Sequence, residues 1–463
     1  MSTYNDNLSD DERELIRHYE EADALGRLDY FDVNEMEIII EHYLYDGDPR
    51  NAQKALEYGF KLHPGDRYLQ CQKAAILLQR GQLQEALRLI DLYRDADDPV
   101  HTFNRAEILY KLGRKNEALA IFRDLVENND DENDTPGLCS DIIRLVNSQN
   151  DFKNSLYFFD KALAINPNDL DLLETKGMTL DDMGQKAEAA AIYNKVLDAD
   201  PYRVSTWHML GICHFESGKF REALTAYDYA LAIEPSDSIA LAQKAFCQFN
   251  IGDEKGGIAT CVKYLRNNPD DEEMLVLLGQ CYANIDKTTE AQQLFQKALT
   301  INPKNSSAWF GLSLIELWHG KTNKAKQYIT KAIDLSPNTP DMFVALAKIQ
   351  QEEKNFEGAI DTLLHVVNNL NGDMAEAWGK LGENYMSVND SAKALEAYER
   401  AIKLCDEQHL QVDELPLLAA VACYDNADYD KAQHYYDRAK RLNDKAKNAI
   451  LSVIPGAGKH LDL

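Results

Sequence analysis

Hydrophobic residues recur along this chain at spacings that suit pairs of amphipathic helices. In the segment 204–237, apolar residues fall at i, i+3, i+4 and i+7 in two runs separated by Gly218. This spacing places the apolar side chains of each run on one face of a helix. Gly218 tolerates the left-handed conformation that ends many helices, and Pro235 ends the second run because the residue before a proline avoids helical geometry. The pattern predicts two antiparallel helices joined by a tight turn.

The same register recurs about every 34 residues on both sides of this segment. A unit of this kind cannot bury its own apolar face, so we expect neighbouring units to stack into one continuous array from 33 to 446. Before the array, in 1–32, we expect a capping helix at 8–27. A second capping helix is expected at 443–453, so that the last part of the chain, 447–463, holds the end of this helix. The remainder, 454–463, is expected to be a frayed tail. Clear copies occupy 136–169, 170–203, 238–271, 272–305, 306–339 and 375–408, weaker copies occupy 33–66, 67–98, 99–132, 340–374 and 413–446, and short insertions fall at 133–135 and 409–412.

The residues of the segment 204–237 resemble the tetratricopeptide repeat, whose pattern has Trp-x2-Leu-Gly early, Ala-x3-Phe or Tyr in the middle and Pro near the end. One position departs from it, because His214 stands where the family has a second aromatic residue. The resemblance implies an all-α fold, a right-handed superhelical solenoid of about twelve antiparallel helix pairs. It rests on Trp207, Leu210, Gly211, Ala223, Tyr227, Ala230 and Pro235, and on their equivalents in the clear copies.

The overall charge narrows the classes of partner. The chain carries 49 Lys and Arg against 77 Asp and Glu, a net charge of -28. Nucleic acids and anionic lipids call for a basic face, so we expect neither as a partner. The first residues are acidic rather than basic, which does not suit a signal peptide, and no apolar run is long enough to predict a membrane span. The eight cysteines are scattered without metal-binding spacing, which favours a reducing cytoplasm.

No catalytic motif competes with the repeat pattern. Gly211 and Gly218 superficially suggest a phosphate-binding loop, but the spacing is too long and Phe220 stands where Ser or Thr is required. Asp181 and Asp182 are adjacent on a helix, so their carboxylates do not converge. Because the array leaves no room for a separate catalytic domain, we predict a protein that is not an enzyme and that holds no cofactor and no metal.

The family resemblance also indicates where a partner would bind, since the first helix of each unit lines the inner surface through positions 2, 5, 9, 12 and 13. In the middle units these positions form an apolar and aromatic strip, and carboxylates stand on either side of it. We hypothesise that this strip binds a protein or peptide with apolar anchors and basic flanks; the alternative is that it packs between neighbouring helices. The strip comprises His208, Ile212, Phe215, Phe246, Phe249, Phe310, Leu314 and Trp318, and the flanking carboxylates are Asp171, Glu174, Asp181, Asp182, Asp341 and Glu352.

These observations together predict a non-catalytic scaffold or adaptor that is a monomer or a weak homo-oligomer. A regulatory subunit of an enzyme complex and a self-assembling structural protein are the alternatives. The Lys, Arg and Asn pattern with which some members of the family grip a C-terminal carboxylate does not occur in three successive units, so a chaperone-tail adaptor is not expected.

Overall fold

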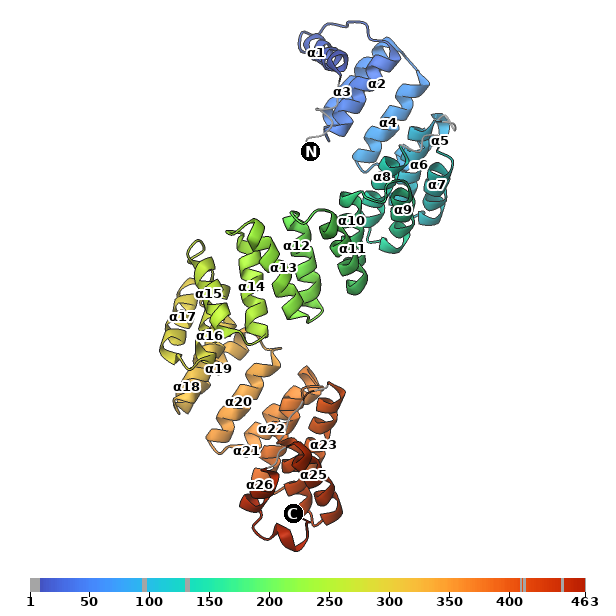
Figure 1. The fold of residues 1–463 in the computed structure, drawn as a ribbon. Helices are drawn as coiled ribbons and strands as arrows, with labels where there is room; N and C mark the ends of the chain where they lie inside the picture. The colour runs from blue at the N-terminus through green and yellow to red at the C-terminus, as the bar shows by residue number, and fades with distance from the viewer. Residues whose placement is uncertain are drawn as a thin grey trace. The chain divides into compact units, whose positions relative to one another are not determined.

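The computed structural model describes residues 9–93, 98–129, 134–408, 410, 414–442 and 445–462. They fall into two compact units, Met1–Pro201 and Tyr202–Leu463. All regular structure in the described residues is helical, which confirms the all-α prediction (Figure 1). Several predicted features lie partly outside these residues: the two insertions (133, 409, 411 and 412), the starts of the two capping helices (Leu8 and Asn443), Leu463 in the tail, and parts of the units 67–98, 99–132 and 413–446.

The first unit opens with a single helix, α1 (Asp10–Ala24). Ser9 caps it, and Tyr19 packs edge-on against the rings of Phe31, Tyr43 and Tyr58, so α1 covers the first helix pair. Antiparallel helix pairs follow α1 along the chain. They are α2 (Val33–Tyr45) with α3 (Pro49–Leu62), α4 (Arg67–Gln79) with α5 (Leu83–Tyr93), α6 (Pro99–Lys111) with α7 (Lys115–Glu127), α8 (Thr135–Ser148) with α9 (Phe152–Ile165), and α10 (Leu170–Asp182) with α11 (Lys186–Ala199).

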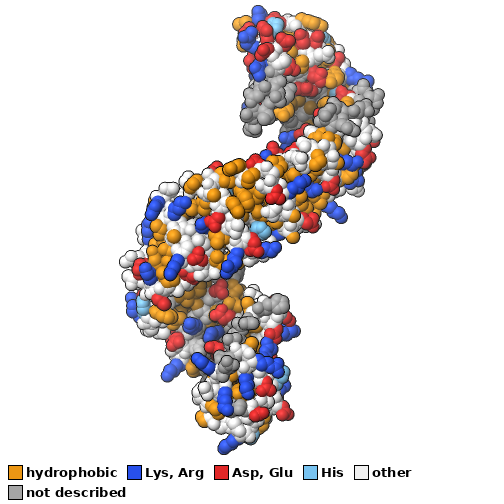
Figure 2. Space-filling view, viewed as in Figure 1, with side chains coloured by type: hydrophobic (Ala, Val, Ile, Leu, Met, Phe, Trp, Pro, Cys, Tyr) orange, Lys and Arg blue, Asp and Glu red, His pale blue; other side chains and the backbone are white. Residues whose placement is uncertain are grey.

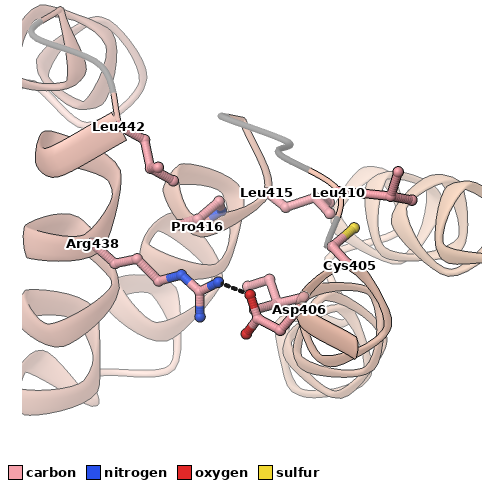
Figure 3. A pocket seen from close by; sticks show the side chains of 8 residues that line it. Cys405, Asp406, Leu410, Leu415, Pro416, Arg438 and Leu442 are labelled. Carbon is pink, nitrogen blue, oxygen red and sulfur yellow. Dashed lines mark hydrogen bonds and ion pairs between the residues drawn. The ribbon is translucent and has the colours of Figure 1, made fainter. Parts of the chain in front are cut away.

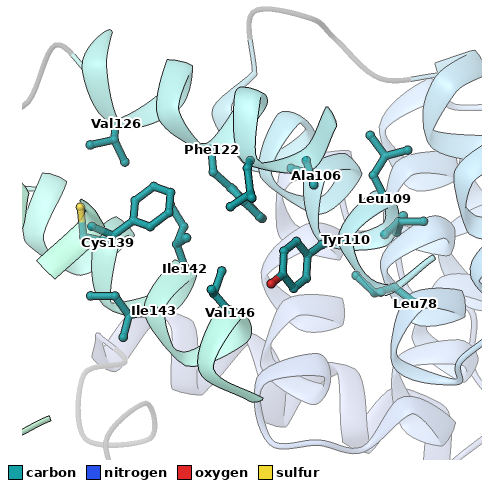
Figure 4. Packing of buried hydrophobic residues seen from close by; sticks show 14 of the residues in the cluster. Leu78, Ala106, Leu109, Tyr110, Phe122, Val126, Cys139, Ile142, Ile143 and Val146 are labelled. Atoms are coloured by element: carbon teal, nitrogen blue, oxygen red, sulfur yellow. The ribbon is translucent and has the colours of Figure 1, made fainter. Parts of the chain in front are cut away.

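The core of the first unit runs continuously from one pair to the next. A single buried cluster extends from α4 to α10, and its centre is formed by Tyr110, Phe122 and Ile142 (Figure 4). No pair could exclude water from these side chains alone, which is the physical reason for stacking.

The second unit continues in the same register. Its helices are α12 (Val204–Glu216) with α13 (Phe220–Ile233), α14 (Ser238–Asn250) with α15 (Glu254–Leu265), α16 (Glu272–Asn284) with α17 (Thr288–Ile301), α18 (Ser306–Trp318) with α19 (Thr322–Leu335), α20 (Pro340–Glu352) with α21 (Phe356–His365), α22 (Ala375–Ser387) with α23 (Ser391–Glu407), α24 (Leu415–Asp425) with α25 (Tyr429–Leu442), and the capping helix α26 (Ala446–Val453). Within this unit α16 packs against both α14 and α18, so the first helices of successive pairs lie side by side.

Glycines on the first helices allow the partner helix to approach closely. A Cβ atom at Gly279 would lie 2.7 Å from the ring of Phe295 on α17, and one at Gly382 would lie 2.5 Å from the ring of Tyr398 on α23. Gly211 faces Tyr227 in the same way. Each of these glycines therefore makes room for the large aromatic residue of its partner helix.

The turn after each first helix takes a left-handed conformation whether or not it holds glycine. Gly218, Gly252 and Gly320 have φ of 70°, 73° and 71°, and the residues at the same register position, Asp286 and Lys354, have φ of 61° and 58°. The repeat geometry imposes this conformation, because it reverses the chain within two residues.

The unit 340–374 is one residue longer than the usual repeat of 34 residues. The chain accommodates this extra residue at the end of the second helix of the unit. After α21 the chain forms a π-helical turn, η1 (Val366–Leu370), whose ring is closed by the N–H of Asn371 donating to the carbonyl of Val366 at 2.8 Å. A π-turn holds one residue more than an α-turn, so the next pair returns to register.

The end of the chain is more ordered than the sequence suggests. The prediction of a frayed tail at 454–463 is wrong for its described residues, because Ala457 and Leu461 are buried against α24, α25 and α26. The ring of His460 stacks on that of Tyr429, with centroids 4.1 Å apart. The tail thus covers apolar surface of the last pair together with α26.

Candidate functional site

The second unit contains an apolar cavity of about 310 Å³ between three neighbouring first helices, α14, α16 and α18. Phe249 enters it from α14, and Phe310, Leu314 and Trp318 enter it from α18. The ring of Phe295 forms part of its wall, because Gly279 and Gly311 leave space for that ring on both sides. Its volume is at the lower end of the range typical of ligand pockets, about 300–1,000 Å³.

Trp318 is the most exposed large side chain of this cavity. It is 73% exposed, and Leu314, one helical turn earlier on the same face, is 42% exposed. Exposed aromatic side chains beside an apolar cavity are typical of binding surfaces, because covering them removes apolar area from water.

A second, polar cavity of about 350 Å³ adjoins the first, and Gln280 of α16 lines both. Phe246 of α14 enters the polar cavity, and Val276 and Leu277 of α16 form its apolar base. Its other walls come from the start of α16, from the turn before α18 and from the start of α18: Glu272, Glu273, Asn302, Lys304, Asn305, Ser306 and Ser307. We call the two cavities together the α14–α16–α18 groove.

The polar end of the groove is held in place by hydrogen bonds. Asn302 donates from Nδ2 to the Oε1 atom of Glu272 at 3.0 Å. Asn305 caps α18 by accepting from the backbone N–H of Ala308 at 2.9 Å. Glu273 lies on the exposed side of the first turn of α16.

Figure 2 shows hydrophobic side chains gathered among charged ones over α12 to α15 of the second unit. Ile212 and Ile239 are exposed on the first helices α12 and α14. The apolar character of the second unit's surface therefore extends from the groove toward the start of this unit.

Comparison with known families agrees with this architecture. Profiles described as tetratricopeptide repeats match residues 40–101 and 174–238, 103–131, 306–339 and 375–407. A profile described as the N-terminal TPR repeats region of Psidin matches residues 215–312. The chain belongs to the tetratricopeptide repeat family. Repeats of this family mediate protein–protein interaction, and the family is typically a non-catalytic scaffold.

Solved structures of tetratricopeptide repeat proteins are similar at low sequence identity. A tetratricopeptide repeat protein from Parabacteroides merdae is 18% identical over 55% of this chain and 98% of its own, with a TM-score of 0.49. The Cut9–Hcn1 hetero-tetramer of the APC/C is 14% identical over 94% and 91%, with a TM-score of 0.46. YrrB, described as a TPR protein with an unusual peptide-binding site, is 19% identical over 42% and 97%, with a TM-score of 0.36. A search of curated proteins finds no match.

The structure brings together half of the strip that the tetratricopeptide pattern predicts. Phe249, Phe310, Leu314 and Trp318 meet at the apolar cavity, and Phe246 lies in the adjoining polar one. Phe246 and Phe249 also pack against the buried cluster around Cys261 and Leu277, and Phe310 packs against the cluster around Ile329. These three rings therefore serve both the repeat interfaces and the groove.

The other strip residues lie outside the groove. Phe215 packs edge-on against Phe220 and against the buried cluster around Tyr227. His208 approaches Asp237, its Nε2 atom lying 2.6 Å from Oδ2. Ile212, at 37% exposure, remains on the surface of α12.

The predicted flanking carboxylates fall in both units. Asp341 and Glu352 are exposed at the two ends of α20 in the second unit. In the first unit all four lie on α10, where Asp181 forms an ion pair with Lys186 at 2.7 Å; the other three are Asp171, Glu174 and Asp182.

Several residues that line the groove are not among those predicted from the sequence. Glu273 and Gln280 occupy positions 2 and 9 of their repeat, which the family uses for recognition, so their position numbers alone would have identified them. Phe295 and Asp286 could not be found in this way, because they belong to a second helix and a turn that reach the cavity only after neighbouring repeats pack.

A smaller cavity of about 100 Å³ lies among α23, α24 and α25 (Figure 3). Arg438 of α25 and Asp406 of α23 form an ion pair at this cavity, so its charged groups neutralise each other. Among the described residues no His, Cys, Asp or Glu side chains gather as a metal site would require, and none of the described helices has the length and hydropathy needed to cross a membrane.

Proposed function

We propose that this chain is a non-catalytic scaffold or adaptor that holds a peptide segment of a partner protein in the α14–α16–α18 groove. The observation that carries the proposal is the exposure of Trp318 beside a cavity lined by Phe249, Phe310 and Leu314. Large aromatic anchors in grooves contribute a disproportionate share of binding free energy, and truncating one typically costs 2 kcal/mol or more, roughly a thirtyfold loss of affinity.

The buried cysteines support a role without nucleophilic catalysis and a reducing location such as the cytoplasm. All eight are free and buried. Burial raises the pKa of Cys247 and Cys261 to about 12, so their thiols stay protonated at neutral pH.

A pull-down with the full-length chain, followed by mass spectrometry, tests the proposal. We expect Trp318→Ala and Leu314→Ala to lose the partners that the unmodified chain captures, while the thermal melt stays nearly unchanged. Leu335→Ala is the matched control, because Leu335 on α19 is 39% exposed and lies outside the groove. Equal capture by all variants would contradict the proposal.

The same variants also separate the two alternative functions. If they lose self-association, measured by sedimentation, instead of partner capture, the result would favour a self-assembling protein. Capture of a single enzyme by the unmodified chain would favour a regulatory subunit.

A further inference from the structure

The groove changes its chemistry along a single helix face. Glu273, Val276, Gln280 and Ala283 of α16 follow one another at helical spacings of three or four residues, and they line first the polar cavity and then the apolar one. Side chains at these spacings share one face of a helix. A ligand lying along α16 therefore contacts an acidic region at one end and an apolar region at the other.

The charges at the polar end favour a cation. Glu272 and Glu273 line the polar cavity, and Lys304 is the only basic residue among the lining residues of both cavities. Within the described part of the chain, neither glutamate lies within ion-pair distance of a Lys, Arg or His. A third carboxylate, that of Asp286, stands at the apolar end. An ammonium or guanidinium group would find two unneutralised carboxylates here.

An anion would find a poorer environment at the same place. The start of α16 carries the positive end of the helix dipole, but Asp271 caps it by accepting from the N–H of Met274 at 2.9 Å. The carboxylates of Glu272 and Glu273 in the first turn offset the remaining positive potential.

The length of α16 sets the spacing between the two ends. From Glu273 to Ala283 the helix rises about 15 Å, at 1.5 Å per residue. An extended peptide advances about 3.3 Å per residue, so it covers this length in four or five residues.

We infer that the groove selects an extended peptide in which a Lys or Arg lies four or five residues from a bulky apolar anchor. The anchor, a Leu, Phe or Trp side chain, enters the cavity lined by Phe249, Leu314 and Trp318, and the basic residue pairs with Glu272 and Glu273. This inference rests on the proposed function and adds the charge and the spacing of the bound segment.

Selection from a library of random twelve-residue peptides displayed on phage, with the full-length chain immobilised, tests the spacing. Selected peptides are then synthesised, and their Kd values are measured by fluorescence anisotropy. We expect the selected peptides to share an apolar anchor residue and a Lys or Arg four or five residues before or after it. For the double variant Glu272→Gln and Glu273→Gln, we expect the anchor preference to remain, the basic preference to disappear, and the Kd of the original peptides to rise roughly fivefold, as for partly exposed ion pairs.

The matched control is Glu222→Gln together with Glu290→Gln, which removes the same charge from the first turns of α13 and α17, outside the groove. An equal rise in Kd for this control would show a general effect of net charge and overturn the inference.

The remaining outcomes separate the two proposals. Three outcomes would overturn the inference and leave the proposed function standing. In each, the selected peptides need Trp318 for binding, but they carry no basic residue, or an acidic residue at the expected spacing, or a basic residue about ten positions from the anchor. If no selected peptide loses affinity on Trp318→Ala, the proposed function itself fails.

Discussion

The Nε2 atom of His208 lies 2.6 Å from the Oδ2 atom of Asp237, the residue that caps α14. The Oδ1 atom of Asp237 accepts from the backbone N–H groups of Ile239 and Ala240 at 2.9 and 3.1 Å. One carboxylate therefore links the first helix of one repeat to the first helix of the next. Contacts of this kind supply the interface free energy on which a repeat array depends.

Replacing Asp237 should weaken this link. We expect Asp237→Ala to lower the free energy of unfolding by about 1–2 kcal/mol, because it removes an N-cap and the partner of His208. Asp237→Asn keeps the cap and loses the charge, so its effect should be smaller. Urea denaturation followed by circular dichroism measures both, and equal losses for the two variants would show that the cap contributes little.

A methyl group at Gly279 should force α16 and α17 apart. Its Cβ would lie 2.7 Å from the ring of Phe295, and we expect Gly279→Ala to cost about 1–3 kcal/mol of stability, the usual range for overpacking. Gly456→Ala is the control, since no atom lies within 4 Å of the added Cβ. A Tm for Gly279→Ala as high as that of the control would mean that the helix pair adjusts freely.

Ala427 occupies a left-handed turn position, with φ of 59°. Glycine adopts this conformation without the clash between Cβ and the following carbonyl, so Ala427→Gly should stabilise the chain by about 1 kcal/mol. The same substitution at Ala259, an exposed position within α15, should destabilise it by about 1 kcal/mol. Thermal melts of the two variants should shift in opposite directions, and a shift in the same direction would contradict the argument.

Stability should depend on pH through His214. Burial, and secondarily the nearby Lys219, lower the pKa of His214 below its ordinary value of about 6.5. Between the two values the unfolded chain binds more protons than the folded one, so stability falls as the pH is lowered from 6.5 toward the folded pKa. The variant His214→Tyr, which restores the family's aromatic residue, should show a smaller drop in Tm between pH 7.5 and 5.5. An unchanged drop would exclude His214 as its source.

Phe246 and Trp318 should respond differently to truncation. Phe246 packs against the buried cluster of α15 and α16, whereas Trp318 is 73% exposed. We therefore expect Phe246→Ala to cost about 2 kcal/mol, less than the 3–5 kcal/mol of a fully buried Phe, and Trp318→Ala to cost little. A large loss of stability for Trp318→Ala would mean that this residue belongs to the core.

The repeat follows from local patterns in the chain. The helix starts and ends, the glycine turns and the contacts of Gly211, Gly279 and Gly382 all follow from local rules: a 3.6-residue apolar period, capping side chains, and residues small enough for close approach. Because each repeat is built from contacts within about 34 residues, a pattern in the chain is enough to predict them.

Which apolar side chains line the groove depends on packing between neighbouring repeats. Phe215 and Phe249 occupy the same position of their repeats, yet Phe215 packs against Phe220 while Phe249 lines the apolar cavity. The difference depends on side chains from neighbouring repeats and turns, such as Phe295 and Asp286, which no local pattern relates to the groove. The π-turn after α21 and the docking of His460 on Tyr429 were likewise decided by packing, because each uses space that appears only when the helices come together.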